Sequence, residues 1–128
     1  MILPNGVEVY NATPHRLVFY EQTWLNEVVV PGEEILTAYA RNVVIGHIGE
    51  VELVKLTFQP MEEGLELIER IKRRHPKALI VGSIIAAQAY RGDVVSPVPC
   101  YRGSREKKTR VKQEYVKASR FTIFPKEQ

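Results

Sequence analysis

The chain has few of the features that build disulfide-stapled or membrane-spanning folds. Cys100 is its only cysteine, so an intramolecular disulfide is excluded and a reducing compartment is expected. No apolar run approaches the roughly 20 residues that a membrane-spanning helix needs. The first ten residues, MILPNGVEVY, lack the basic region and the apolar core of a secretory signal. We therefore expect a cytoplasmic protein with no membrane partner.

The chain also lacks the residue patterns of common catalytic and cofactor sites. His15, His47 and His75 lie on separate predicted elements, and none has another metal-ligating residue at the usual spacing. Gly82-Ser83 follows an apolar stretch, but no glycine-rich loop, following lysine or G-x-S-x-G sequence accompanies it. We expect no metal and no cofactor, and these patterns do not favour an enzyme.

What remains is the composition of an ordinary globular domain. The chain has 128 residues, of which 45% are hydrophobic and 26% are charged. This length suits one domain around one core, so residues 1–128 are predicted to form a single domain with a basic excursion at about residues 102–119. The bias toward Val, Ile, Glu, Lys and Arg would suit a thermophile.

The charge is distributed unevenly along the chain. Residues 1–60 carry seven acids and three bases, which is a local charge of −4. Residues 102–128 carry nine bases and three acids, which is a local charge of +6. Such a polarised chain can attract a polyanion to its basic end, although a solvated basic segment explains the same residues.

The first half is predicted to consist of β-strands. Alternating or β-branched residues, interrupted by turn residues such as Thr13-Pro14 and Pro31-Gly32, mark the strands. We expect the first two strands to form a hairpin or corner, and the whole set to form an antiparallel sheet or partial barrel. The predicted strands are Val7–Ala12, Arg16–Tyr20, Val28–Val30, Ile35–Ala40, Val43–Gly49 and a stretch from Glu50 to about Phe58.

The second half is predicted to add helices, so the fold class is α+β. Residues Met61–His75 form an amphipathic helix, with Met61, Leu65, Ile68 and Ile71 on its apolar face and Leu67 at the edge of that face. The nearly uncharged stretch Ala78–Asp93 is typical of a buried strand that leads into a short helix.

The remaining C-terminal elements are less regular. Pro97 and Pro99 interrupt a short apolar run, which is typical of an edge strand or a surface loop. Residues Arg120–Phe124 are predicted to form a closing C-terminal strand, so the basic excursion before it should project as a loop, a hairpin arm or a helix that orders with a partner.

A candidate pocket brings together Asn11, His15, His47, Ser83 and Asp93. Ser83 at the start of a helix could present backbone amides to an anion, and Gly46 and Gly49 could let a ligand approach His47. Four of these residues also have a structural interpretation: a turn side chain for His15 and Asp93, a bulge for His47 and a helix N-cap for Ser83.

The basic excursion is the second candidate site. Its bases are interleaved with Tyr101 and Tyr115, which could stack on bases of a nucleic acid. A solvated loop is the alternative interpretation. The candidate nucleic-acid-binding residues are Arg102, Arg105, Lys107, Lys108, Arg110, Lys112, Lys117 and Arg120.

Two segments resemble a set of small uncharacterised proteins of phages and prokaryotes. In that set an N-x-T-P-H motif follows an N-terminal strand, and a V-x-S-x-x-A-x-A segment precedes an aspartate and a proline. Here Asn11–His15 is similar to the first motif, with Ala12 at a position where the set has leucine. Val81–Ala89, followed by Asp93 and Pro97, is similar to the second. The resemblance implies a viral or prokaryotic origin, with the host cytoplasm as the location if viral, and no particular mechanism.

Three hypotheses for the function follow from the sequence. The first is an accessory protein that is not an enzyme and binds nucleic acid through the basic excursion. The second is a small-ligand or nucleotide-binding protein, or an enzyme, that uses the candidate pocket. The third is a structural or partner-binding subunit, in which sheet edges or the Val28–Val30 strand mediate a homodimer.

Overall fold

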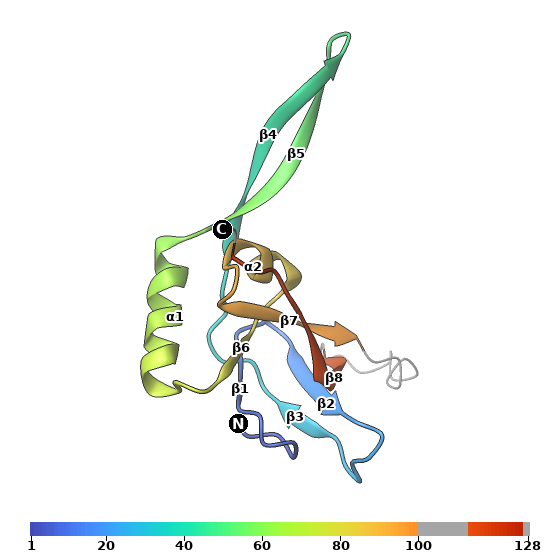
Figure 1. Cartoon of the computed structure of the whole chain (residues 1–128), viewed down its shortest axis with the longest axis vertical. Coiled ribbons are helices and arrows are strands. Elements are labelled where there is room, and N and C mark those ends of the chain that lie inside the picture. Colours follow the sequence, from blue (N-terminus) through green and yellow to red (C-terminus); the bar gives the residue numbers. More distant parts are fainter. Residues whose placement is uncertain (100–112, 127–128) are drawn as a thin grey trace.

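The computed structural model describes residues 1–99 and 113–126. These residues form a six-stranded sheet, two helices and a two-stranded sheet that projects away from the rest (Figure 1). The strands are β1 (Val9–Asn11), β2 (Arg16–Tyr20), β3 (Val28–Val30), β4 (Ala38–Ile48), β5 (Val51–Pro60), β6 (Leu79–Val81), β7 (Val94–Pro99) and β8 (Gln113–Ile123), and the helices are α1 (Glu62–Arg74) and α2 (Ile84–Ala89).

The six-stranded sheet draws strands from both halves of the chain. Its order is β1-β6-β7-β8-β2-β3. The β1–β6, β6–β7 and β2–β8 pairs are parallel, whereas β7–β8 and β2–β3 are antiparallel. Asn11 Nδ2 donates to the Val30 carbonyl over 2.9 Å and thereby links β1 to β3, the two end strands of a nearly closed sheet. The α+β class is as expected, but the N-terminal strands do not form an antiparallel sheet of their own.

Two apolar clusters lie on opposite faces of this sheet. Because side chains alternate along a strand, neighbouring residues enter different clusters: Ile80 and Val94 enter one, and Val81 and Val95 enter the other. The first cluster also contains the buried faces of α1 and α2, whereas the second contains Phe19 and other β-strand residues. The strand-to-helix prediction for Ala78–Asp93 is confirmed by this placement.

Helix α1 agrees with the amphipathic helix expected over Met61–His75. Its first turn is acidic and its last turn is basic, which suits the helix dipole at both ends. Leu67, Ile68 and Ile71 are buried, but Leu65 is 50% exposed. The expected apolar face was therefore wrong for Leu65, whereas Leu67 is buried beside Ile68 and Ile71.

The C-terminal strands differ from the sequence-based expectation. β7 lies between β6 and β8, so it is neither a loop nor an edge strand. Of the residues in β7, only Val94 and Val95 pair with β6. Pro97 and Pro99 lie beyond that contact, where β8 is the one described strand that pairs with β7. The closing strand is also longer than expected, because β8 begins at Gln113 and takes in the end of the basic excursion.

The projecting β4–β5 hairpin, here called the arm, is the largest departure from expectation. Ile35–Ala40 and Val43–Gly49 were expected as two strands of a sheet or barrel. Instead β4 runs through Arg41 and Asn42 without a break and pairs with β5 along its whole length. The chain turns between the two strands at Gly49, where φ is +59°.

Candidate functional site

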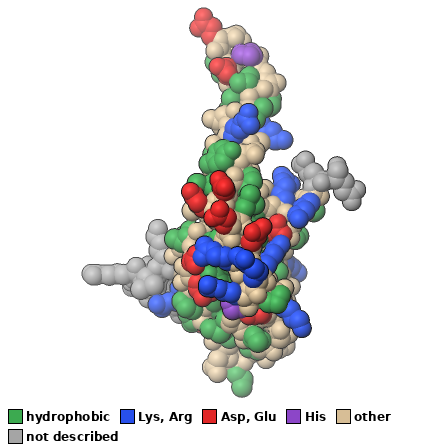
Figure 2. All heavy atoms as spheres, turned by 90° about the vertical axis from the view of Figure 1, so that its left-hand side faces the viewer, with side chains coloured by type: hydrophobic (Ala, Val, Ile, Leu, Met, Phe, Trp, Pro, Cys, Tyr) green, Lys and Arg blue, Asp and Glu red, His purple; other side chains and the backbone are tan. Residues whose placement is uncertain are grey.

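Most of the arm is exposed on both of its faces. Within the described part of the chain, the base of the arm packs on the domain, where β5 lies against α2 and Ala38 reaches the first apolar cluster. Figure 2 shows hydrophobic side chains along the length of the arm and acidic side chains towards its far end. The exposed large apolar residues of the arm are Tyr39, Val43, Val44, Ile45, Ile48, Val51, Leu53, Val54 and Leu56.

The two outer edges of the arm are unequal. Within residues 1–99 and 113–126, no third strand pairs with either β4 or β5. β4 has a bulge between Val44 and Gly46, which leaves Ile45 without a cross-strand partner, whereas β5 is regular. A bulge hinders pairing along an edge, so β5 offers the better edge for an additional strand.

The charged residues of the arm are arranged along its length. Glu50 and Glu52 lie at the tip, where Glu52 is opposite His47. Lys55 lies in the middle of β5 and Arg41 lies nearer the base of β4. The two acids and two bases balance, and the negative charge is confined to the tip.

The hydroxyl group of Tyr90, at the end of α2, holds both chain segments that enter the arm. It donates to the carbonyl of Thr37, just before β4, over 2.7 Å. It also accepts a hydrogen bond from the Met61 backbone N–H, just after β5, over 3.0 Å. A side chain at Gly64 would overlap this hydroxyl, because a Cβ there would lie 1.8 Å from it. The glycine inside α1 therefore makes room for the group that fixes the root of the arm.

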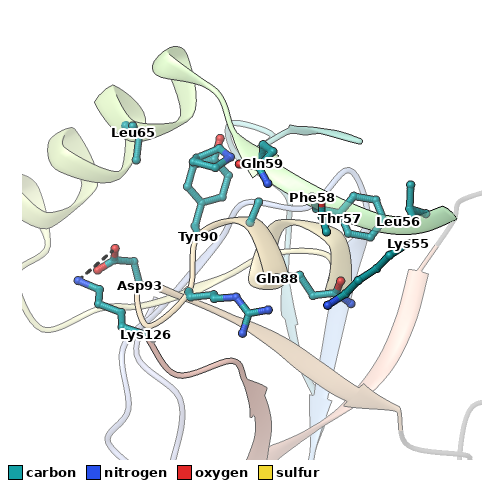
Figure 3. A pocket seen from close by; sticks show the side chains of 13 residues that line it. Lys55, Leu56, Thr57, Phe58, Gln59, Leu65, Gln88, Tyr90, Asp93 and Lys126 are labelled. Carbon is teal, nitrogen blue, oxygen red and sulfur yellow. Dashed lines mark ion pairs between the residues drawn. The ribbon is translucent and has the colours of Figure 1, made fainter. Parts of the chain in front are cut away.

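A hollow of about 580 Å³, here called the basal hollow, lies beside the base of β5 (Figure 3). Its lining comes from β5, α1, α2, the turn before β7 and the segment after β8. The lining residues are Lys55, Leu56, Thr57, Phe58, Gln59, Pro60, Leu65, Gln88, Ala89, Tyr90, Arg91, Asp93 and Lys126.

The basal hollow carries an excess of positive charge. Asp93 is the only acid among the described residues that line it. Its carboxylate pairs with Lys126 at 3.9 Å (Figure 3) and also with Lys72 at 2.5 Å. Arg91 lies over the ring of Phe124, 5.7 Å from its centroid. Among the residues that the structure describes, no carboxylate forms an ion pair with Lys55 or Arg91. The hollow is therefore suited to an anionic group.

The five residues of the candidate pocket do not share a cavity. His47 lies near the tip of the arm, and Ser83 caps α2 by accepting a hydrogen bond from the Ala86 N–H over 3.1 Å. His15 is half-buried in the turn before β2. Asp93 alone lines the basal hollow. The structural interpretations of Ser83 and of the turn residues are the ones that the geometry supports.

Asn11 has a structural role as well. Its amide nitrogen donates to the carbonyls of His15 and Val30, at 2.8 and 2.9 Å. Its amide oxygen accepts hydrogen bonds from the backbone N–H and the hydroxyl of Thr13, at 3.0 and 2.7 Å. This fully buried side chain thus folds the Asn11–His15 turn and joins it to β3. The turn also needs Gly32, because a Cβ there would lie 2.5 Å from the Thr13 carbonyl oxygen.

Most of the predicted nucleic-acid-binding residues lie outside the described part of the chain. Of that set, only Lys117 and Arg120 are described, and both belong to β8. Val116 and Ala118 of the same strand are buried in the second apolar cluster. The interpretation of the basic excursion as a projecting segment is therefore wrong for residues 113–119, which are part of the sheet.

Glu21 fastens the end of β2 to β8. Its carboxylate accepts hydrogen bonds from the Ser119 hydroxyl, the Ser119 N–H and the Ala118 N–H, at 2.5, 2.9 and 3.1 Å. The Ser119 hydroxyl is the main cause that lowers the pKa of Glu21 below its usual value of 4.5, and the two N–H groups and Lys117 act in the same direction. All of these groups favour the charged carboxylate over its protonated form.

A second hollow, of about 390 Å³, lies between β1 and α1. Burial, together with the charges of Glu33 and Glu34, raises the pKa of Tyr10 in its wall. His75 Nδ1 lies 3.1 Å from the Glu8 carboxylate, and the His75 ring is 6.1 Å from the ring of Tyr10. These contacts fix the C-terminal end of α1 against the sheet.

Comparisons with known proteins add no assignment to these features. No protein-family model, curated protein or solved structure matches the chain. The resemblance of Asn11–His15 and Val81–Ala89 to the phage and prokaryotic set therefore stays a prediction. In the described part of the chain, no three His, Cys, Asp or Glu residues are grouped as a metal site. No described helix is long and apolar enough to cross a membrane.

Neither the arm nor the basal hollow was predicted as a site. The strands of the arm were predicted, but as part of a larger sheet or barrel. One available signal was that apolar residues occupy both alternating positions between Val43 and Leu56, which does not suit a strand with one solvent face. The convergence of Lys55, Arg91 and Lys126 had no comparable signal, because these residues come from distant segments.

Proposed function

We propose that this chain is an accessory protein of viral or prokaryotic origin that assembles as a homodimer through its arm. Its role in this proposal is assembly and partner binding rather than catalysis. The observation that carries the proposal is the exposure of apolar side chains on both faces of a ribbon of only two strands.

The physical chemistry of the arm calls for a covering partner. An isolated two-stranded hairpin is at best marginally stable in water, and a contiguous exposed apolar surface marks an interaction site. The unpaired backbone groups along the arm are also a template for another strand. A partner that adds strands and covers apolar side chains would meet both needs.

A second copy of the chain fits this surface better than a nucleic acid does. A phosphate-tracking arm needs a clear excess of bases, but the bases and acids of this arm balance and its tip is acidic. A second copy brings the same apolar side chains and the same unpaired edges, as a two-fold interface requires. The arm also offers strands of ten and eleven residues, whereas β3, the edge strand first considered for a homodimer, has three.

The test is the effect of arm substitutions on the mass of the protein in solution. Val43 and Leu53 are each 42% exposed and have no role in the core, so Val43→Thr with Leu53→Thr keeps residues that suit a strand. We expect this variant to shift the monomer–dimer equilibrium, measured by sedimentation equilibrium, towards monomer by at least about tenfold. The matched control is Leu25→Thr at a 98% exposed position off the arm, which should dimerise like the wild type. Unchanged dimerisation of the arm variant would exclude the arm as the interface.

Nucleic-acid binding through the Arg102–Arg120 segment is a second proposal, which rests on the local charge of +6 in residues 102–128. Deleting residues 102–119 is not a clean test, because the deletion would remove buried residues of β8. Replacing Lys107, Lys108 and Arg110 with Gln should instead weaken binding and reduce its salt dependence, measured by fluorescence anisotropy with labelled DNA and RNA.

The matched control for this second proposal removes the same charge elsewhere. Arg73, Arg74 and Lys77 are exposed near the end of α1, and their replacement with Gln should leave nucleic-acid binding intact. Absence of binding by the wild type at low salt would reject the proposal.

A further inference from the structure

We infer that the basal hollow receives the acidic tip of the arm of a second copy, so that the two arms lie side by side and antiparallel. This inference rests on the proposed homodimer and specifies its geometry. The tip carries Glu50 and Glu52, and the hollow presents Lys55 and Arg91 without acidic partners among the described residues.

The regular edge of β5 determines which strands meet. Because β4 carries the bulge at Ile45, the pairing that keeps a full ladder of hydrogen bonds joins β5 to β5 of the second copy. The resulting sheet has four strands, with the two β4 strands outside. A two-fold axis perpendicular to this sheet puts the same face of both β5 strands on one side of the sheet. Two residues that lie opposite each other must therefore both have even numbers or both have odd numbers.

Charge restricts the register further. A two-fold centre at Glu52 or at Lys55 would place two like charges directly opposite each other, which is destabilising. A centre at Leu53 or Val54 avoids this conflict. With Val54 at the centre, Glu52 of one copy lies opposite Leu56 of the other, and the turn that carries Glu50 comes next to Phe58.

That register places the acidic tip at the basal hollow. Leu56 and Phe58 both line the hollow, so the two carboxylates of the second copy arrive at its wall. Glu52 lies on the same face of β5 as Leu56 and Phe58, because side chains at even positions share a face. Ala38 and Ala40 are the cross-strand neighbours of Pro60 and Phe58, and Ala38 packs against the core, so this face is turned towards the domain at the base of the arm. The tip therefore directs Glu52 towards the side where Arg91 lies.

A charge-exchange experiment tests this contact. The tip variant is Glu50→Lys with Glu52→Lys, and the hollow variant is Arg91→Glu with Lys126→Glu, two basic residues of the lining that lie outside β5. Each variant has like charges at both contacts of its own homodimer, so we expect dimerisation to weaken by at least about tenfold at low salt. An equimolar mixture restores opposite charges at both contacts and should form a heterodimer with an affinity near that of the wild-type homodimer.

The control variant changes charge on a different surface of the protein, and specific results would contradict the proposed contact. Glu66→Lys with Glu69→Lys makes the same change of charge on the exposed face of α1 and should leave the dimer unchanged. If the wild type is dimeric but either exchanged variant dimerises equally well, or if mixing restores nothing, the tip does not bind the basal hollow. A monomeric wild type would overturn the proposed homodimer itself. Sedimentation velocity with one variant fluorescently labelled distinguishes these results.

Discussion

At the scale of single residues, several polar side chains of this protein serve the fold through complete sets of hydrogen bonds. The side-chain amide of Asn11 forms hydrogen bonds with three backbone groups, the carbonyls of His15 and Val30 and the N–H of Thr13. The Ser83 hydroxyl accepts a hydrogen bond from a backbone N–H in the first turn of α2. The same residues are the ones that the sequence motifs single out. These hydrogen bonds give both residues a structural role, and no binding role is needed to explain them.

Asn11→Ala should destabilise the protein strongly. The substitution leaves the carbonyls of His15 and Val30 and the N–H of Thr13 without their partner, so we expect the free energy of unfolding to fall by roughly 2–4 kcal/mol. Urea denaturation measures the change. Asn26→Ala, at an exposed position, is the control and should alter stability by less than about 0.5 kcal/mol. A change as small as this at Asn11 would contradict a structural role.

Glu21 should make stability depend on acid pH. Its pKa is lowered in the folded protein, so the charged carboxylate stabilises the fold above the usual pKa of 4.5, and this stabilisation is lost as pH falls through the lowered pKa. Glu21→Gln cannot titrate. We therefore expect the variant to be less stable than the wild type at pH 7 and the difference to shrink below pH 4.5. Thermal unfolding at several pH values measures this, and a difference that does not vary with pH would contradict it.

At the scale of elements, local patterns predicted strands and helices well, whereas pairing between distant strands was not predictable. The alternation in Arg16–Tyr20 and the helical periodicity of α1 are visible in a short window of sequence. The insertion of β7 between β6 and β8 and the parallel pairing of β2 with β8 depend on contacts between distant segments. The arm shows the same limit, because its strands were located but their departure from the main sheet depends on the Tyr90 contacts at its root.

The register proposed for the paired arms predicts a specific cross-link. In a Cys100→Ser background, Val54→Cys places one thiol opposite its copy across the two-fold centre, so oxidation should yield a covalent dimer on a non-reducing gel. Val44→Cys is the matched control, because Val44 lies opposite Val54 on the arm and both are 47% exposed. In the four-stranded sheet the two copies of residue 44 are about 14 Å apart, which is beyond disulfide reach. Equal cross-linking of both variants would contradict this register.

At the scale of the whole molecule, the protein combines a well-packed domain with an arm that the domain does not cover. Many apolar residues of the sheet and helices are enclosed in two clusters, whereas nine large apolar residues of the arm are exposed at 42% or more. This contrast is the reason for proposing a second copy, because an arm of this composition gains most from a surface like its own. The excess of bases beyond residue 101 is a separate property of the chain and needs its own test.

The mass of the wild-type protein in solution is the most direct measurement of whether the arm is an assembly element. Sedimentation equilibrium over a range of micromolar concentrations should give twice the chain mass of 14.6 kDa, with dissociation only on dilution. A mass of 14.6 kDa at every concentration would show that the arm stands uncovered in solution and would contradict the proposed homodimer.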